Sequence, residues 1–142
     1  MLTGATGFVG KVVLYELLRR REELDLEKVR LLIRPSRNSD AAKRFKTEIV
    51  SSRCFDGLDF DWQDYVEPVE SDLSEPRLGI DADTLAAIQE SVTHVINCAA
   101  SVQFDLPIAQ AAKANVTTAL EMLELARGCT RLERFLSVST AY

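Results

Sequence analysis

The chain has 142 residues, of which 46% are hydrophobic and 27% charged, a balance typical of one globular domain. Its net charge of −5 argues against a nucleic-acid-binding surface, which is normally basic. No run approaches the roughly 18 apolar residues of a membrane-spanning helix, and no signal peptide is visible, so we expect a cytoplasmic protein without a membrane segment. Cys54, Cys98 and Cys129 are too far apart for a metal knuckle or redox pair, so we expect ordinary thiols and no metal.

Short β-rich runs alternate with helical runs along the chain. The expected strands occupy residues 29–34, 65–71, 93–99 and 134–139. The expected helices occupy residues 8–20, 40–50, 81–92 and 107–127. Strands that alternate with helices predict an α/β fold, here a doubly wound parallel sheet of the Rossmann type with right-handed crossovers.

The first and last expected helices carry clear apolar patterns. The pattern of the first comprises Val9, Val12, Val13, Leu17 and Arg20. The stripe of the last comprises Ile108, Ala112, Asn115, Ala119, Met122 and Ala126. Pro107 suits the first turn of that helix, and Gly128 suits its exit. We expect the irregular stretch 52–64, which includes Trp62, to be a surface excursion.

A glycine-rich loop precedes the first helix. Gly4, Gly7 and Gly10 give the spacing G-x-x-G-x-x-G, in which the first glycine permits a tight turn and the second a close approach to a pyrophosphate. The third lets the helix pack closely on the sheet. Phosphates would then rest on N–H groups of the helix that starts near Phe8, at the positive end of its dipole. The alternative is a turn whose glycines serve packing alone.

The strand that should precede this loop is short. Only Met1 and Leu2 come before Thr3, whereas a strand typically takes about five or six residues. We therefore interpret residues 1–142 as a partial dinucleotide-binding domain, truncated at its start, with the first strand clipped.

The end of the second expected strand distinguishes the two nicotinamide dinucleotides. NAD enzymes place an acid there to hold the ribose 2′-hydroxyl, whereas an arginine suits the 2′-phosphate of NADP. This chain has Arg34 at that point and no acid before Asp40, and Arg37 and Arg44 lie close enough to help. A guanidinium fork suits a phosphate dianion, which favours NADPH. The alternative is an arginine that is only exposed to solvent.

Further candidates follow the third and fourth expected strands. Asp72 comes just past the third strand and could accept a hydrogen bond from an adenine amino group. Ala99 and Ala100 come just past the fourth and leave room for a ribose, although turn chemistry alone would also explain these residues. Asn115 interrupts an apolar stripe. A buried amide needs partners, which could be backbone groups or the active site.

These segments resemble one known family. "TGATGFVGKVV", "LLIRP", "ESDLSEPRLGI", "NCAASVQFDLPI", "ANVTTALEMLELAR" and "FLSVSTAY" resemble the NAD(P)-binding part of fatty acyl-CoA reductases. These are extended short-chain dehydrogenases, also called the male-sterility domain family. The resemblance spans essentially the whole chain, and "CAASVQFD" followed by "VSTAY" is its most selective part.

The resemblance implies a role for each matching residue. The residues that would bind the cofactor NADPH are Gly4, Thr6, Gly7, Phe8, Val9, Gly10, Arg34, Arg44, Asp72, Leu73, Ala99, Ala100 and Asn115. Thr140 would be the catalytic hydroxyl, with Asn115 beside it in the catalytic set. The family's Tyr-x-x-x-Lys motif does not occur in these residues. We therefore expect a fragment truncated at both ends, whose substrate domain is absent and which is inactive alone.

The implied activity is NADPH-dependent reduction of a fatty acyl-CoA or acyl-carrier thioester to an aldehyde or alcohol. Three alternatives stay open: a carrier-bound thioester reductase, another extended dehydrogenase or epimerase, and a non-catalytic NADPH-binding module.

Overall fold

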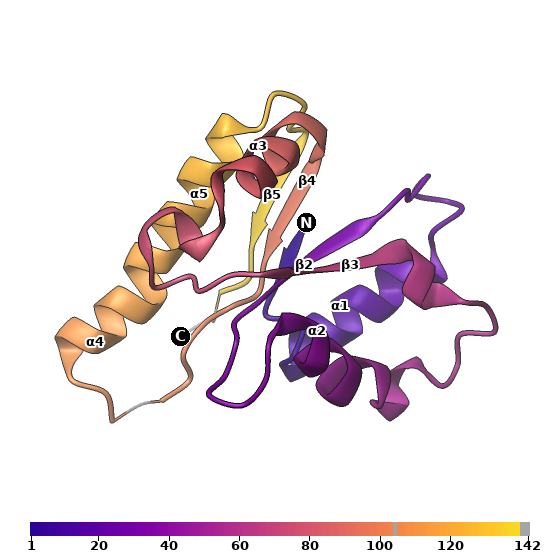
Figure 1. Ribbon diagram of the computed structural model, residues 1–142, viewed down its shortest axis with the longest axis horizontal. Helices are drawn as coiled ribbons and strands as arrows, with labels where there is room; N and C mark the ends of the chain where they lie inside the picture. The colour runs from indigo at the N-terminus through magenta and orange to yellow at the C-terminus, as the bar shows by residue number, and fades with distance from the viewer. Residues whose placement is uncertain (104, 140–142) are drawn as a thin grey trace.

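A computed structural model of the chain describes residues 1–103 and 105–139 and contains a five-stranded sheet (Figure 1). Its strands are β1 (Leu2–Thr3), β2 (Val29–Ile33), β3 (Val66–Glu70), β4 (His94–Asn97) and β5 (Arg134–Ser137). The strand order is β3-β2-β1-β4-β5, and each neighbouring pair is parallel. The predicted parallel sheet is confirmed, and the four longer strands lie within their predicted ranges.

Helices cover both faces of this sheet, as the doubly wound prediction requires. One face carries α1 (Phe8–Arg19), α2 (Ala41–Arg44) and the π-helical η1 (Phe45–Val50) (Figure 1). The other carries α3 (Ala82–Ser91) and a long helix made of α4 (Ile108–Ala112), the π-helical η5 (Lys113–Thr117) and α5 (Thr118–Gly128). Within the described residues, three short 3-10 helices lie in the connections: η2 (Arg53–Phe55), η3 (Trp62–Tyr65) and η4 (Pro76–Gly79).

Strand β2 shows how the two layers share one sheet. Leu31 and Ile33 belong to the buried cluster that includes Leu14 and Leu18 of α1. Leu32, between them, belongs to the cluster formed with α3 and α5. Successive side chains of a strand point to opposite faces, so the part of a strand that is covered on both sides, here residues 31–33, is apolar without alternation. This explains why "VRLLI" does not alternate.

The predicted apolar face of α1 was partly wrong. The residues of α1 that are buried are Gly10, Leu14 and Leu18, whereas Val9 and Val12 are 48% and 42% exposed. Apolar residues occur on more than one side of this helix, so periodicity alone does not select the buried side. Gly10 determines which side of α1 is buried, because the side that carries this glycine is the one that can pack closely on the loop after β1.

The stretch 52–64 is not merely a surface excursion. Trp62 is only 7% exposed and stacks on Phe55, with ring centroids 4.7 Å apart. It also meets Phe45 of η1 edge-on at 6.2 Å. The segment therefore carries aromatic residues into the core between α1 and η1, which its irregular pattern did not reveal.

The helix predicted at 107–127 departs from its stripe in the first half. Pro107 caps α4 rather than lying in its first turn, and Gly128 is the last residue of α5. Met122 is fully buried, but Ile108 is 88% exposed and Asn115 is also exposed. The π-helical η5 changes the number of residues per turn, so a stripe drawn at constant helical spacing does not stay on one face.

Candidate functional site

The glycine loop lies where the sheet changes its winding direction. β1 pairs with β2 on one side and with β4 on the other, and ligands bind outside the carboxyl ends of strands at such a point. Gly4 follows β1 with φ +71°, and a β-carbon on it would lie 2.7 Å from the carbonyl carbon of Cys98. A left-handed conformation and this close approach both require glycine.

The other two glycines bring the N-terminus of α1 against the loop. A β-carbon on Gly10 would lie 2.2 Å from the carbonyl oxygen of Gly4, so only glycine allows this packing. The N–H of Gly7 donates to the same oxygen at 2.9 Å. Gly7 is the N-cap of α1 and has no side chain to cap the first turn. The positive end of the helix dipole is thus open to an anion.

Thr3, on the neighbouring strand β1, fixes the end of β4, a role that its sequence context did not predict. Its fully buried hydroxyl donates to Oδ1 of Asn97 at 2.6 Å and accepts from the N–H groups of Cys98 and Ala99, each at 3.1 Å. A hydroxyl has one donor and two acceptor sites, and all are used here. These bonds therefore hold the backbone of Cys98 and Ala99 in place at the carboxyl end of β4.

A cavity of about 640 Å³ opens at this edge of the sheet. Nine of the predicted site residues line it: Gly4, Thr6, Gly7, Arg34, Arg44, Asp72, Leu73, Ala99 and Ala100. They come from the loops after β1, β2, β3 and β4, and from α2. The volume lies within the usual range for small-molecule sites, about 300–1,000 Å³.

Four predicted residues lie outside the lining. Phe8 is 84% exposed and Val9 is 48% exposed, whereas Gly10 is buried beneath the loop. Asn115 does not line the cavity, but its side chain hydrogen-bonds the backbone of Ser101, which does. Backbone groups of Phe8 and Val9 remain candidates for phosphate contact, because they belong to the first turn of α1.

Arginines form the wall of the cavity next to β2. Arg34 follows β2 and lines the cavity with an exposed side chain. Arg44 of α2 donates through Nη1 to the carbonyl oxygen of Arg34. It also donates through Nε and Nη2 to Glu48, at 2.6 and 2.8 Å. This wall is therefore cationic, with one of its two guanidinium groups already oriented by neighbours.

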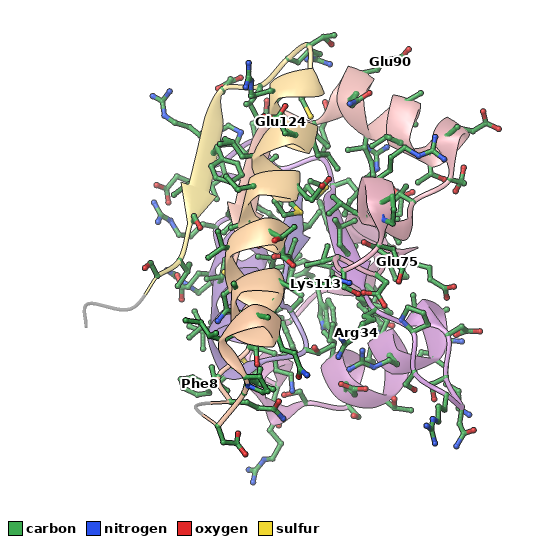
Figure 2. All side chains as sticks on the ribbon, turned by 90° about the vertical axis from the view of Figure 1, so that its left-hand side faces the viewer. Phe8, Arg34, Glu75, Glu90, Lys113 and Glu124 are labelled. Carbon is green, nitrogen blue, oxygen red and sulfur yellow. The ribbon has the colours of Figure 1, made fainter. Side chains whose placement is uncertain are left out.

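An ionised carboxylate faces this wall. Oδ1 of Asp72 accepts from the backbone N–H and the hydroxyl of Ser74, at 3.0 and 2.7 Å. Burial raises the pKa of Asp72, but the bonds from Ser74 and the charges of Arg34 and Lys113 outweigh it and hold the pKa below its usual value. Figure 2 shows Arg34 and Lys113 on the same face of the molecule. At neutral pH this group is an acceptor only.

Asn115 holds the loop that follows β4. Its Oδ1 accepts from the N–H of Ser101 at 2.7 Å, and its Nδ2 donates to the carbonyl oxygen of the same residue at 3.1 Å. The expectation that this amide is buried was wrong, and its observed partners are backbone groups. The π-helical η5 carries the side chain, whose paired bonds orient the cavity-lining Ser101.

Several cavity residues were missed by the sequence analysis. They are Leu32, Ile33, Ser74, Cys98, Ser101, Gln103, Leu106, Gln110, Ala114 and Thr118. Most are small or apolar, so no chemical motif marks them. Those on the last helix recur at 110, 114 and 118, and this spacing of four could have signalled a helix face along the cavity.

The cavity offers no activated thiol or metal cluster within the described residues. The three cysteines are free, as predicted, and burial raises the pKa of the Cys98 thiol, which keeps it protonated near neutral pH. No group of three or more His, Cys, Asp or Glu in the described part of the chain could hold a metal ion. Thr140, the predicted catalytic hydroxyl, lies outside the described residues.

The described helices include none that is long and apolar enough to cross a membrane.

Comparisons with known proteins place the fold among reductases. Residues 2–142 match the NAD-binding family described as male sterility protein. The chain is 36% identical over 145 aligned residues to fatty acyl-CoA reductase 1 of Gallus gallus, and 33% identical to that of Homo sapiens. In both cases the match covers 100% of this chain and 28% of the relative. The chain thus spans less than a third of the length of these relatives.

Solved structures of reductase domains share the fold. The terminal R domain of the myxalamid PKS-NRPS biosynthetic pathway matches with a TM-score of 0.79 at 29% identity, over 98% of this chain and 33% of that one. The reductase domain of a non-ribosomal peptide synthetase from Mycobacterium tuberculosis matches with a TM-score of 0.76 at 34% identity. That match covers 99% of this chain and 32% of the other.

Proposed function

This chain belongs to the male sterility protein family of NAD(P)-binding domains, and on that premise we propose that it binds NADPH within an acyl-thioester reductase. The observation that carries the choice of cofactor is the cationic wall after β2. Arg34 and Arg44 both line the cavity, and no carboxylate occupies the point after β2 where a ribose 2′-hydroxyl would be held. A 2′-phosphate dianion fits this charge, whereas a free hydroxyl gains less from it.

The remaining walls fit the other parts of a dinucleotide. The first turn of α1, capped by Gly7 without a side chain, suits the pyrophosphate. Asp72 can accept a hydrogen bond from the adenine amino group, because its carboxylate is ionised at neutral pH. Ala99 and Ala100 leave space beside the loop fixed by Thr3, where the ribose on the nicotinamide side would lie.

The proposed reaction is reduction of a thioester carbonyl. NADPH supplies the hydride in this chemistry. Thr140 would donate a hydrogen bond to the oxyanion that develops on the substrate carbonyl. Asn115 would act beside it by fixing the loop at Ser101, which borders the cavity. Leu106 and Ala114 add apolar surface to the same cavity.

Fatty acyl-CoA is the substrate that we propose first, because curated relatives of that activity align over the whole chain. A carrier-bound thioester is the second candidate, because reductase domains of peptide synthetases share the fold at up to 34% identity. The family assignment also leaves a non-catalytic NADPH-binding module as an outcome of the test.

The test is a turnover assay on the full-length protein with NADPH or NADH and two substrates: a long-chain acyl-CoA and the same acyl group on a carrier protein. We expect NADPH oxidation with acyl-CoA and release of free CoA with an aldehyde or alcohol. Faster turnover of the carrier-bound substrate would favour the second candidate. NADPH binding without turnover of either substrate would favour the binding module.

A further inference from the structure

Glu48 does not line the cavity, but it accepts two charge-assisted hydrogen bonds from Arg44, which does. Its Oε1 accepts from Nε of Arg44 at 2.6 Å, and its Oε2 accepts from Nη2 at 2.8 Å. This is the bidentate geometry that fixes the plane of a guanidinium group. The bond from Arg44 lowers the pKa of Glu48, so this carboxyl group is ionised at neutral pH.

The N–H donors of Arg44 fall into two groups: those bound to neighbouring residues and those left without a bond to the described part of the protein. A guanidinium group has five N–H donors. Two of them bind Glu48, and one on Nη1 binds the carbonyl oxygen of Arg34. Two N–H groups are left by these bonds, one on each terminal nitrogen. Arg44 lines the cavity, so these two N–H groups are its candidates for binding an anion there.

The helix that carries both residues is anchored at its start. Asp40 caps α2 by accepting from the N–H of Lys43 at 2.7 Å. The N–H of Ala41 donates to Glu70, at the end of β3, at 3.2 Å. Arg44 and Glu48 then stand four residues apart across the junction of α2 and η1. The pair is thus fixed relative to the sheet edge.

The Arg44–Glu48 pair is less exposed than the Arg19–Glu16 pair on α1. The side chain of Arg44 is 19% exposed and that of Glu48 is 38% exposed. In the Arg19–Glu16 pair of α1 the corresponding values are 53% and 46%. Exposed pairs hold their geometry weakly, because solvent screens them and both side chains lose rotamer freedom. The less exposed pair is the better suited to keep a guanidinium in one orientation.

We propose that Glu48 is a positioning residue for the adenosine 2′-phosphate, acting through Arg44. Glu48 holds one edge of the Arg44 guanidinium, which leaves the other end directed at the phosphate and keeps Nη1 on the backbone of Arg34. The guanidinium of Arg44 is therefore ordered before the cofactor binds, and binding does not cost its rotamer entropy. This inference rests on the proposed function, since it needs NADPH in the cavity.

The test is Glu48→Gln in the full-length protein, with dissociation constants for NADPH and NADH measured by fluorescence titration. We expect NADPH binding to weaken by roughly tenfold, the size of one lost charge-assisted hydrogen bond, with NADH binding unchanged. Glu16→Gln is the matched control, because it removes an equivalent bidentate pair outside the cavity, and it should alter neither constant. An unchanged or increased preference for NADPH in Glu48→Gln would overturn the proposal.

A double variant separates positioning from general electrostatics and from misfolding. In an Arg44→Ala background, Glu48→Gln should not weaken NADPH binding further, because its effect passes through Arg44. A further loss of similar size there would overturn the proposal. NADH affinity reports folding of the site in each variant. A wild-type protein without preference for NADPH would overturn both this inference and the proposed function, whereas a preference insensitive to Glu48 would overturn this inference alone.

Discussion

Replacing Gly10 by alanine tests the contact that joins α1 to the phosphate loop. The new β-carbon would lie 2.2 Å from the carbonyl oxygen of Gly4, 2.6 Å from its carbonyl carbon and 2.9 Å from Cα of Ala5. Ordinary contact begins at 3.4 Å, so the shortest distance falls short by about 1.2 Å. All three atoms are backbone or Cα atoms, which cannot rotate away as a side chain would. The helix must therefore move off the loop.

The cost follows from this overlap. Overpacking a core costs about 1–3 kcal/mol, and a clash with backbone belongs at the upper end, about 3 kcal/mol. For a domain of this size that lowers the melting temperature by roughly 10 °C. The displaced helix also moves its N-terminal N–H groups, so NADPH binding should weaken in parallel. Circular dichroism during thermal and urea unfolding, with a cofactor titration, measures both effects.

Gly7→Ala is the matched control for this experiment. A β-carbon on Gly7 would meet only the carbonyl oxygen of Gly4, at 3.3 Å, and its φ is −84°, which any residue adopts. We expect its stability to change by less than about 1 kcal/mol, the scale of an unfavourable N-cap residue. A Gly10→Ala protein that unfolds at the same temperature as the wild type would refute the close packing of α1 on the loop.

Three further substitutions test the site. Arg34→Ala should weaken NADPH binding by roughly tenfold or more and leave NADH binding nearly unchanged, because only NADPH carries the 2′-phosphate that Arg34 would bind. Equal weakening of NADPH and NADH binding in titrations would refute that role of Arg34. Thr3→Val leaves Oδ1 of Asn97 and two backbone N–H groups without their bonds, so we expect about 3 kcal/mol lower stability in urea unfolding, and a loss under about 1 kcal/mol would contradict the network. Thr140→Val should lower turnover of the full-length protein with cofactor affinity nearly unchanged; full activity would refute a catalytic hydroxyl.

The sequence predicted the fold through signals that depend on local chemistry. The alternation of strands and helices gave the parallel sheet, and the glycine spacing located the loop at the end of β1. Gly4 could be assigned to the tight turn and Gly10 to the close packing of helix on sheet, because glycine alone permits such backbone conformations and contacts. Arg34 was predicted at the end of β2 and lies there, on the cavity. These inferences needed no knowledge of distant contacts.

The features that the sequence did not predict depend on contacts between distant segments. Trp62 is buried because Phe45 and Phe55 meet it, and no local pattern shows that meeting. Thr3 looked like part of a loop motif, and its role becomes visible only when Asn97 is placed beside it, 94 positions along the chain. The π-helical turn after Ala112 changed which residues of the last helix are buried, so a stripe drawn at constant helical spacing did not stay on one face.

The central claim is that the cavity at the ends of β1, β2, β3 and β4 binds NADPH with its 2′-phosphate against the arginine wall. The most direct measurement is a crystal structure of the full-length protein with NADP⁺. We predict the 2′-phosphate within hydrogen-bond distance of Arg34 and Arg44, and the pyrophosphate at the first turn of α1. A cofactor bound with its 2′-phosphate away from both arginines, or no cofactor in this cavity at saturating concentration, would contradict the account.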